Sequence, residues 1–463
     1  MSWAETMHFK RNTSPRTRNE ETPATVMWPR IAVSLCTFLL VMMGLVMVFS
    51  SSAIVNIDAS VDAHADAVRQ LEFALIGAAA CVVLARIVPY HAWRGVLTWA
   101  FFGGSLILLV LTAAIGTVGL GAQRWLTIGF INLQPSEFAK IGVLLVVAKL
   151  VAEYRQGDLS PRAFRWSFVV INVLIVALIL VAQSDLGTTV ICFVGIVAIL
   201  WLSEVPLRFI GIYSAVIGGL GAAALTTGYR FERLMSFTHP WDDYYGSGYQ
   251  VIHSMYAFAQ GGLFGSGLGN SAEKYLYLPE ASTDFIFSII GEELGLVGAL
   301  FVIGLFLAFL LGGLRMAQEA PDGFGTVLCG AFTVIIVFQA FLNIGCVVGV
   351  MPITGKPLPF ISSGGSSLIT SLIMVGIMLS VSFGSGESPV HRQRRASIRP
   401  MADDDYGRAY RVVPARASRG QVVAAREMRR IEAGRMGTRR QQAGHGRASL
   451  PASGYRYARG RGR

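Results

Sequence analysis

Residues 285–314 read FIFSIIGEELGLVGALFVIGLFLAFLLGGL, a run whose only charged side chains are Glu292 and Glu293. Because a helix rises about 1.5 Å per residue, roughly 20 apolar residues cross the hydrocarbon core of a membrane. We therefore predict that this run is a transmembrane helix. Other apolar runs of similar length bring the number of predicted spans to about ten. The spans are 31–53, 70–89, 96–115, 136–154, 166–183, 187–203, 207–227, 285–314, 324–348 and 366–384.

The composition also indicates a membrane protein. Hydrophobic residues make up 53% of the 463 residues and charged residues only 14%, which excludes a soluble globular domain of this length. The predicted fold class is therefore all-α, with one large outer loop between the seventh and eighth spans. The five cysteines lie in apolar segments, without CxxC spacing or a nearby histidine, so we interpret them as buried residues rather than a disulfide or metal site.

The charges are distributed unevenly along the chain. Residues 384–463 hold 19 arginines and 6 acidic residues, a surplus that exceeds the net charge of +11 of the whole chain. Lys and Arg are about twice as frequent near the predicted inner ends of the spans as in the outer loops, which places both termini in the cytoplasm. The predicted parts are a basic tail (1–30), a membrane domain (31–384) and a disordered arginine-rich tail (385–463) that binds the anionic inner leaflet or an acidic partner.

Asp284 stands where the large outer loop, residues 228–284, meets the eighth span. A long polar loop at a membrane surface is typical of a functional segment, and a charge at its foot is typical of a catalytic group. We interpret Asp284 as a catalytic carboxylate; capping of the following helix is the alternative. The glycine-rich run 261–269 follows no predicted strand, so we predict a close-packed re-entrant turn rather than a dinucleotide site. The candidate binding residues of this loop are Arg230, Arg233, Gln250 and Lys274.

Other polar residues stand at the predicted outer ends of the spans. Glu137 and Lys140 are three residues apart and share a helix face, either as a structural ion pair or as contacts to a substrate. Asp185, in the hairpin between the fifth and sixth spans, either caps the sixth helix or joins the same site. The connector 351–367 contains three prolines and three glycines and is too irregular to face lipid alone. It contributes Lys356 and Ser366, and its SGGSS segment offers backbone N–H groups that suit a phosphate.

Five ordered motifs point to a family. The longest is LPEASTDFIF at 278–287, followed by GEELG at 291–295. The other four are QPSE at 134–137, DLGT at 185–188, GYQ at 248–250, and PITG at 352–355 continuing through PLPF at 357–360 to GGSS at 364–367. Together they resemble the FtsW/RodA/SpoVE (SEDS) family of membrane glycosyltransferases over residues 31–384. The segments 279–281 and 291–293 look more like the division type than the elongation type. Two positions depart from the family pattern: Lys356 stands where the family usually has an apolar residue, and Ser363 where it usually has Tyr.

The resemblance implies that the protein polymerises lipid II into peptidoglycan glycan strands. It implies an active site on the outer face of the bacterial cytoplasmic membrane, at the division septum. The implied partners are a class B penicillin-binding transpeptidase, other division proteins and membrane lipids, and no nucleic acid is expected. The essential aspartate of the family corresponds to Asp284.

The residues suit this chemistry. Transfer of a sugar from a lipid pyrophosphate needs a base near the attacking hydroxyl and positive charge near the leaving group. Pyrophosphate leaves without being protonated, so one carboxylate suffices; Glu292 lies about 12 Å further along the helix and is interpreted, with Glu293, as a buried structural residue. The candidate cations are Arg230, Arg233 and Lys274. No cofactor is assigned, and participation of a divalent cation such as Mg²⁺ or Mn²⁺ is left open.

Three alternatives remain at this stage. An elongation-type, RodA-like polymerase would use the same residues. A flippase or transporter of the lipid-linked precursor would also have about ten spans, but it would favour interrupted helices in two related halves, and the sequence has no such repeat. A scaffold protein would tolerate substitution of Asp284.

Overall fold

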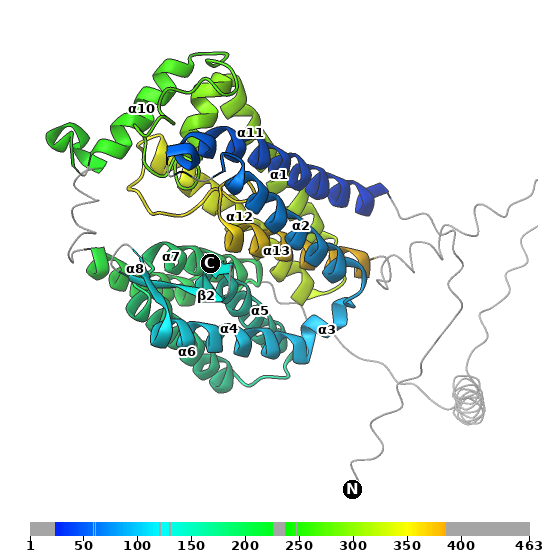
Figure 1. Cartoon of the computed structure of the whole chain (residues 1–463). Coiled ribbons are helices and arrows are strands. Elements are labelled where there is room, and N and C mark those ends of the chain that lie inside the picture. The colour runs from blue at the N-terminus through cyan, green and yellow to red at the C-terminus, as the bar shows by residue number, and fades with distance from the viewer. Residues whose placement is uncertain are drawn as a thin grey trace, which may run out of the picture. The chain divides into compact units, whose positions relative to one another are not determined.

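Helices dominate the described part of the chain (Figure 1). The computed structural model describes residues 24–385 except 59, 61, 120–121, 129–130, 226–236 and 247. The predicted tails therefore lie outside the described residues, apart from the few tail residues that belong to the first and last helices. The long helices are α1 (Ala24–Asp58), α2 (Ala65–Arg86), α4 (Val96–Ile115), α5 (Pro135–Gln156), α6 (Pro161–Val176), α7 (Leu186–Leu202), α8 (Leu207–Leu225), α11 (Ile286–Gln318), α12 (Gly323–Val347) and α13 (Gly365–Ser385).

Each of the ten predicted spans coincides with one of these helices. Within the described residues, eight helices are long and apolar enough to cross a membrane: α1, α2, α4, α6 with its π-helical extension η1 (Ala177–Ala182), α8, α11, α12 and α13. The other two predicted spans correspond to α7, which has 17 residues, and to α5, which carries Glu and Lys residues within its first two turns. A polytopic helical membrane protein is confirmed, and the number of ten spans stays a prediction.

The remaining described elements are short. They are α3 (Tyr90–Arg94), η2 (Pro240–Asp243), α10 (Tyr249–Gly261) and the strands β1 (Thr117–Gly119), β2 (Ala122–Ile128) and β3 (Ile131–Leu133). The strands form an antiparallel sheet in the order β1-β2-β3. This sheet was not predicted from the sequence, because two of its strands have only three residues, too few for the period-2 alternation that indicates a strand. The sheet continues directly into α5 and so positions its first turn.

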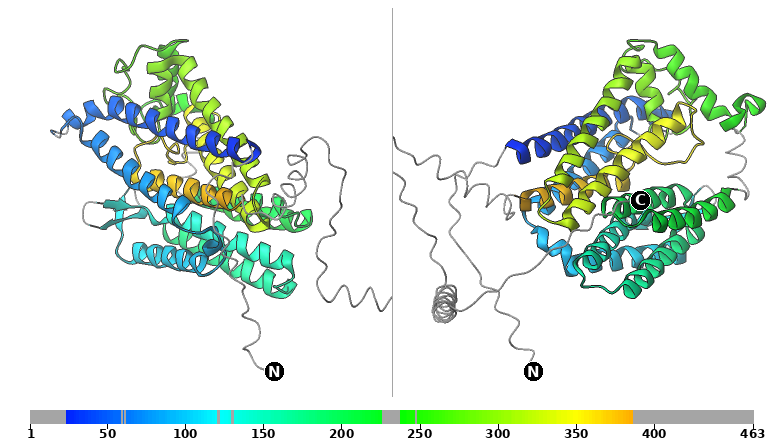
Figure 2. Two further views of the ribbon diagram at one scale, coloured as in Figure 1. Left: turned by 90° about the vertical axis from the view of Figure 1, so that its right-hand side faces the viewer. Right: turned by 180° about the vertical axis from the view of Figure 1, so that it is seen from behind.

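Burial separates the central helices from those at the periphery. In the most apolar segment of α12, 83% of the residues are buried inside the protein, and in that of α13 72% are buried. The corresponding shares are 17% for α2 and 6% for α8. Most residues of α5 are also buried, and they lie on all sides of the helix. α12 and α13 lie between one group of helices, which includes α1, α2 and α11, and a second group formed by α4–α8 (Figures 1 and 2). Polar side chains on α5, α12 and α13 are therefore shielded from lipid.

A break in α11 holds the large loop against the membrane domain. Gly295 has φ +67° inside the helix, so the carbonyl groups before it lack helical partners. The chain that follows α10 supplies them, because the Ser266 N–H donates to the Glu292 carbonyl at 2.9 Å. In return, the Leu296 N–H donates to the Gly262 carbonyl at 3.0 Å. These bonds confirm close packing of the run 261–269, and its re-entrant position in the membrane stays a prediction.

Candidate active site

The backbone around Asp284 is held by hydrogen bonds to three successive carbonyl groups. The Ser363 N–H donates to the Ser282 carbonyl at 2.9 Å, and the Ser362 hydroxyl donates to the Thr283 carbonyl at 2.6 Å. The Asn343 side-chain amide donates to the Asp284 carbonyl at 2.8 Å. The connector between α12 and α13 and the end of α12 therefore fix the residues that lead into α11. This constraint pre-positions a side chain, as catalysis requires.

The Asp284 side chain is half-buried at the N-terminal end of α11. The N-cap position of this helix is occupied by Phe285, and no side-chain capping bond is made there. Asp284 therefore stands one residue before the N-cap position. Its position is accessible enough for a carboxylate to meet a substrate at the end of the bundle.

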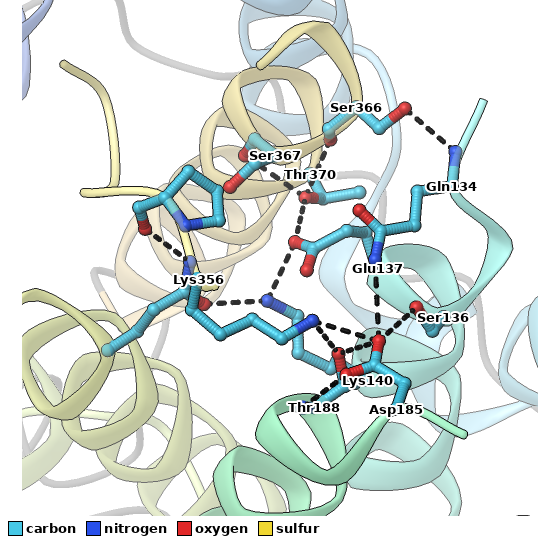
Figure 3. Close-up of polar contacts among 12 residues, drawn as sticks. Gln134, Ser136, Glu137, Lys140, Asp185, Thr188, Lys356, Ser366, Ser367 and Thr370 are labelled. Carbon is cyan, nitrogen blue, oxygen red and sulfur yellow. Dashed lines mark hydrogen bonds and ion pairs between the residues drawn. The ribbon is translucent and has the colours of Figure 1, made fainter. Parts of the chain in front are cut away.

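Next to this segment lies a group of buried polar side chains from α5, the start of α7, α12, the connector after it and α13 (Figure 3). We call it the outer polar cluster, after the outer ends of the spans predicted from the sequence. In its first part, Lys140 Nζ lies 2.8 Å from Glu137 Oε2, with both side chains at most 2% exposed. The same ammonium donates to Gln339 Oε1 at 2.8 Å, and Gln339 Nε2 donates to the Pro357 carbonyl at 2.9 Å. Glu137 and Lys140 thus form an ion pair, the first of the two alternatives, and the pair links α5 to α12 and the connector after it.

The second part of the cluster centres on Asp185. Lys356 Nζ lies 2.8 Å from Asp185 Oδ2 and donates to the Thr188 hydroxyl at 2.6 Å. The Thr188 N–H donates to Asp185 Oδ1 at 3.0 Å, so the carboxylate also caps α7, as its position predicts. Burial alone would raise the pKa of Asp185, but the Lys356 ammonium and the bonds from Thr188 outweigh it and hold this pKa below its usual range. Asp185 is therefore a carboxylate and Lys356 its counter-ion.

Lys356 and Ser366 both join this cluster, although they come from the connector and from α13. The Ser366 hydroxyl accepts a hydrogen bond from the Gln134 N–H at 3.0 Å, just before α5 begins. The Thr370 hydroxyl donates to Glu137 at 3.5 Å (Figure 3). The family-atypical Lys356 is thus accommodated, because Asp185 neutralises its charge.

Asn343 connects this cluster to Asp284. Its amide nitrogen also donates to the Lys356 carbonyl at 2.8 Å, so one side chain bridges the backbones of Lys356 and Asp284. The binding residues predicted from the sequence did not include Asn343, Thr188, Gln339 or Thr370. A polar residue deep in an apolar run was the available signal for Asn343 and Gln339.

Lys274 lies in a different buried network. Its Nζ is 2.9 Å from Glu293 Oε1, with side chains 3% and 0% exposed, and Ser50 of α1 donates to the same carboxylate at 2.7 Å. Nearby, Glu292 accepts hydrogen bonds from the Ser271 hydroxyl and the Ala272 N–H. Both glutamates are thus buried, as expected from the sequence, Glu293 in an ion pair and Glu292 in hydrogen bonds. Lys274 contacts one of them rather than the outer polar cluster.

The other candidate residues are placed as follows. Gln250 lies half-buried in the first turn of α10. Arg230 and Arg233 lie outside the described residues, so their role stays a prediction. Among the residues that the structure describes, no group of three or more His, Cys, Asp and Glu side chains could hold a metal ion. Participation of a divalent cation stays a prediction, and we assign no step to such an ion.

Comparisons with known proteins place the chain in a family. A family model described as cell cycle protein, FtsW/RodA/SpoVE, matches residues 30–386. Stage V sporulation protein E of Bacillus subtilis is 39% identical over 364 residues, which cover 76% of this chain and 97% of that protein. The probable peptidoglycan glycosyltransferase FtsW of Geobacter metallireducens is 38% identical over 358 residues, covering 76% and 92%. A solved structure described as "Structural coordination of polymerization and crosslinking by a peptidoglycan synthase complex" matches with a TM-score of 0.62 and 27% identity, covering 76% of this chain and 97% of that one. The chain therefore belongs to the FtsW/RodA/SpoVE family.

Proposed function

We propose that this protein is a peptidoglycan glycosyltransferase that polymerises lipid II into glycan strands and releases the polyprenyl pyrophosphate carrier. The observation that carries the proposal is the 38% identity, over 92% of its length, to a protein named as a probable peptidoglycan glycosyltransferase. The position of Asp284 supports it. A carboxylate on a fixed backbone at the end of a helix bundle is what transfer from a membrane-anchored donor requires.

In this mechanism Asp284 is the general base. It accepts the proton of the attacking sugar hydroxyl while the bond between the donor sugar and pyrophosphate breaks. The hydrogen bonds to the carbonyl groups of Ser282, Thr283 and Asp284 fix the approach of the carboxylate. Since pyrophosphate is a good leaving group, no second carboxylate has to protonate it. Glu292 and Glu293 are engaged in their own buried contacts and take no part in the transfer.

Positive charge for the leaving pyrophosphate comes from the large outer loop. Arg230 and Arg233 are the preferred groups, because a planar guanidinium donates two parallel hydrogen bonds to phosphate oxygens. Lys274 is the third candidate, but its charge is already opposed by Glu293, and this buried pair would have to open before Lys274 contacted a phosphate. Lys356 is likewise paired with Asp185. Both lysines therefore act on the substrate only through a rearrangement.

The physiological role that we propose is cell division. The motif residues 279–281 and 291–293 and the similarity to proteins named FtsW support this role over an elongation-type one. The partner we infer is a class B penicillin-binding transpeptidase, in line with the similarity to a structure described as a peptidoglycan synthase complex. The site lies at the outer face of the cytoplasmic membrane, as the distribution of Lys and Arg indicates.

The deciding experiment replaces Asp284 by Asn, which keeps the shape and removes the base. Asp284→Asn is expected to lower the rate of polymerisation of purified lipid II by at least about 100-fold, the usual contribution of a general base. The assay uses the full-length protein together with its transpeptidase. Asp242→Asn, at an exposed position of the same loop, is the matched control and should keep the parent rate.

Two further measurements make the result decisive. Thermal unfolding and co-purification with the transpeptidase should be the same for Asp284→Asn and the parent. Full activity of Asp284→Asn would refute the assignment and favour a flippase or scaffold. Loss of activity in the Asp242→Asn control as well would show that the loop, rather than the base, had been disturbed.

A further inference from the structure

A cavity of about 590 Å³ lies where α1 begins and where α2 and α13 end. α13 begins at the outer polar cluster with Ser366 and reaches the cavity with Phe383, about 26 Å further along the helix axis. The cavity is therefore separate from the candidate active site and lies at the opposite end of the bundle. The distribution of Lys and Arg in the sequence assigns this end to the cytoplasmic side of the membrane.

Two arginines from different helices share one aromatic ring in this cavity. The guanidinium carbon of Arg30 lies 4.9 Å from the ring centroid of Phe383, and that of Arg86 lies 4.7 Å from it. Arg30 is also held by Ser382, to whose hydroxyl its Nε donates at 2.8 Å. Two like charges so close to one ring repel each other. An anion bound beside both guanidinium groups would relieve this repulsion.

The rest of the lining is largely apolar. Ile31, Leu35 and Phe38 follow one another on one face of α1, and Val82 of α2 and Leu379 of α13 complete the wall. The three α1 side chains extend over about 10 Å along the helix, away from Arg30 and toward the middle of the membrane. A ligand with an anionic head and an apolar tail matches both halves of this cavity.

We propose that the cavity binds an anionic phospholipid of the cytoplasmic leaflet, with its phosphate between Arg30 and Arg86 and one acyl chain along α1. The planar forks of two arginines suit phosphate oxygens. The phosphate of a lipid lies at the membrane interface, where side chains near helix ends emerge, so no charge has to enter the hydrocarbon. The transmembrane helix of a partner protein would fill the apolar half, but it would supply an anion only by carrying a carboxylate into the membrane, which is costly.

The test is native mass spectrometry of the full-length protein with phosphatidylglycerol or phosphatidylcholine of identical chains. The parent is expected to retain phosphatidylglycerol with about tenfold preference. The double variant Arg30→Gln/Arg86→Gln should lose the preference, because Gln keeps a hydrogen-bond donor but carries no charge. Arg162→Gln/Arg165→Gln is the matched control. It removes two exposed arginines near the start of α6, at the same end of the bundle and outside the cavity, and should bind like the parent.

A second variant tests the apolar half. Ser34→Trp places a large ring in the cavity and leaves both arginines in place, so it should reduce retention of phosphatidylglycerol even in protein with the parent's thermal stability. Three outcomes would overturn the proposal. They are equal loss of the preference in the Arg162/Arg165 control, unchanged retention in Ser34→Trp, and displacement of the lipid by soluble glycerol phosphate at a similar concentration. The last outcome would identify an anion site without a lipid chain.

Discussion

At the scale of single residues, the side chain of Asn343 decides how the candidate base is presented. Its amide nitrogen donates to two carbonyl groups, that of Asp284 and that of Lys356 in the connector after α12. Each bond gives a carbonyl group a hydrogen-bond partner that it would otherwise lack, and a buried polar group without a partner costs about 1–3 kcal/mol. Asn343 is therefore a positioning residue: it contacts the backbone of Asp284, while the carboxylate contacts the substrate.

Asn343→Ala is expected to lower kcat for lipid II polymerisation by about 10- to 100-fold and to leave KM within about threefold, because the base is misplaced while substrate binding is intact. The matched control is Asn172→Ala. Asn172 is also a buried amide, but it lies in α6, where it donates to the Phe168 carbonyl and accepts from the Tyr213 hydroxyl. This control should lose thermal stability and keep kcat. Equal loss of kcat in both variants would show that Asn343 has only a structural role.

At the scale of helices, the break in α11 depends on two glycines that face each other. A Cβ atom on Gly295 would lie 2.4 Å from the Gly265 nitrogen, and one on Gly265 would lie 2.1 Å from the Glu293 carbonyl oxygen. Both glycines also have positive φ, which other residues adopt only at a cost. The close approach lets the chain after α10 bond to the carbonyl groups that the break releases. The glycines are needed for backbone contact, and so for holding the loop that carries Lys274 onto α11.

Gly295→Ala is therefore expected to lower the thermal unfolding midpoint of the detergent-solubilised protein. The positive φ alone costs about 1–2 kcal/mol, and the displaced backbone adds to it. Gly304→Ala, in the same helix, is the matched control, since nothing lies within 4 Å of a Cβ at that position. There the substitution should raise stability by about 0.5–1 kcal/mol, because Ala favours a helix interior. Opposite shifts in the two variants are expected, and equal shifts would contradict this account of the break.

At the scale of the whole molecule, buried ion pairs join helices that are far apart in the sequence. Asp185 precedes α7, while Lys356 belongs to the connector between α12 and α13, and their side chains are at most 3% exposed. α7 belongs to the group of helices formed by α4–α8, whereas α12 and α13 lie between the two groups (Figure 1). The pair thus helps to fix one group of helices against the centre of the bundle, next to Asp284.

Lys356→Met leaves the Asp185 carboxylate buried without its counter-ion, which is expected to destabilise the protein by about 3–5 kcal/mol. The double variant Asp185→Asn/Lys356→Met removes both charges and should recover most of this loss. The measurement is a thermal unfolding series of the parent, both single variants and the double variant. Losses that simply add in the double variant would show that the two charges do not stabilise each other.

The sequence by itself determined the elements and the family. Each predicted apolar run became a helix, because a chain in lipid must satisfy its backbone hydrogen bonds within one segment, and that need is met by local sequence alone. For the same reason the pair Glu137 and Lys140, three residues apart on one helix, was predictable from spacing. The place of Asp284 at the junction of the loop and α11 also followed from the chain order.

Only the tertiary structure decided which polar groups meet. Asp185 and Lys356 are 171 positions apart, and Asn343 bonds to Asp284 over 59 positions, so their contacts depend on how helices pack. Lys274 was predicted as a phosphate ligand because nothing local revealed Glu293 beside it. The cavity with Arg30 and Arg86 likewise arises only where α1, α2 and α13 come together. A charge in a membrane protein is stabilised by whatever opposite charge the fold brings within a few ångströms, and that distance is a property of packing rather than of sequence spacing.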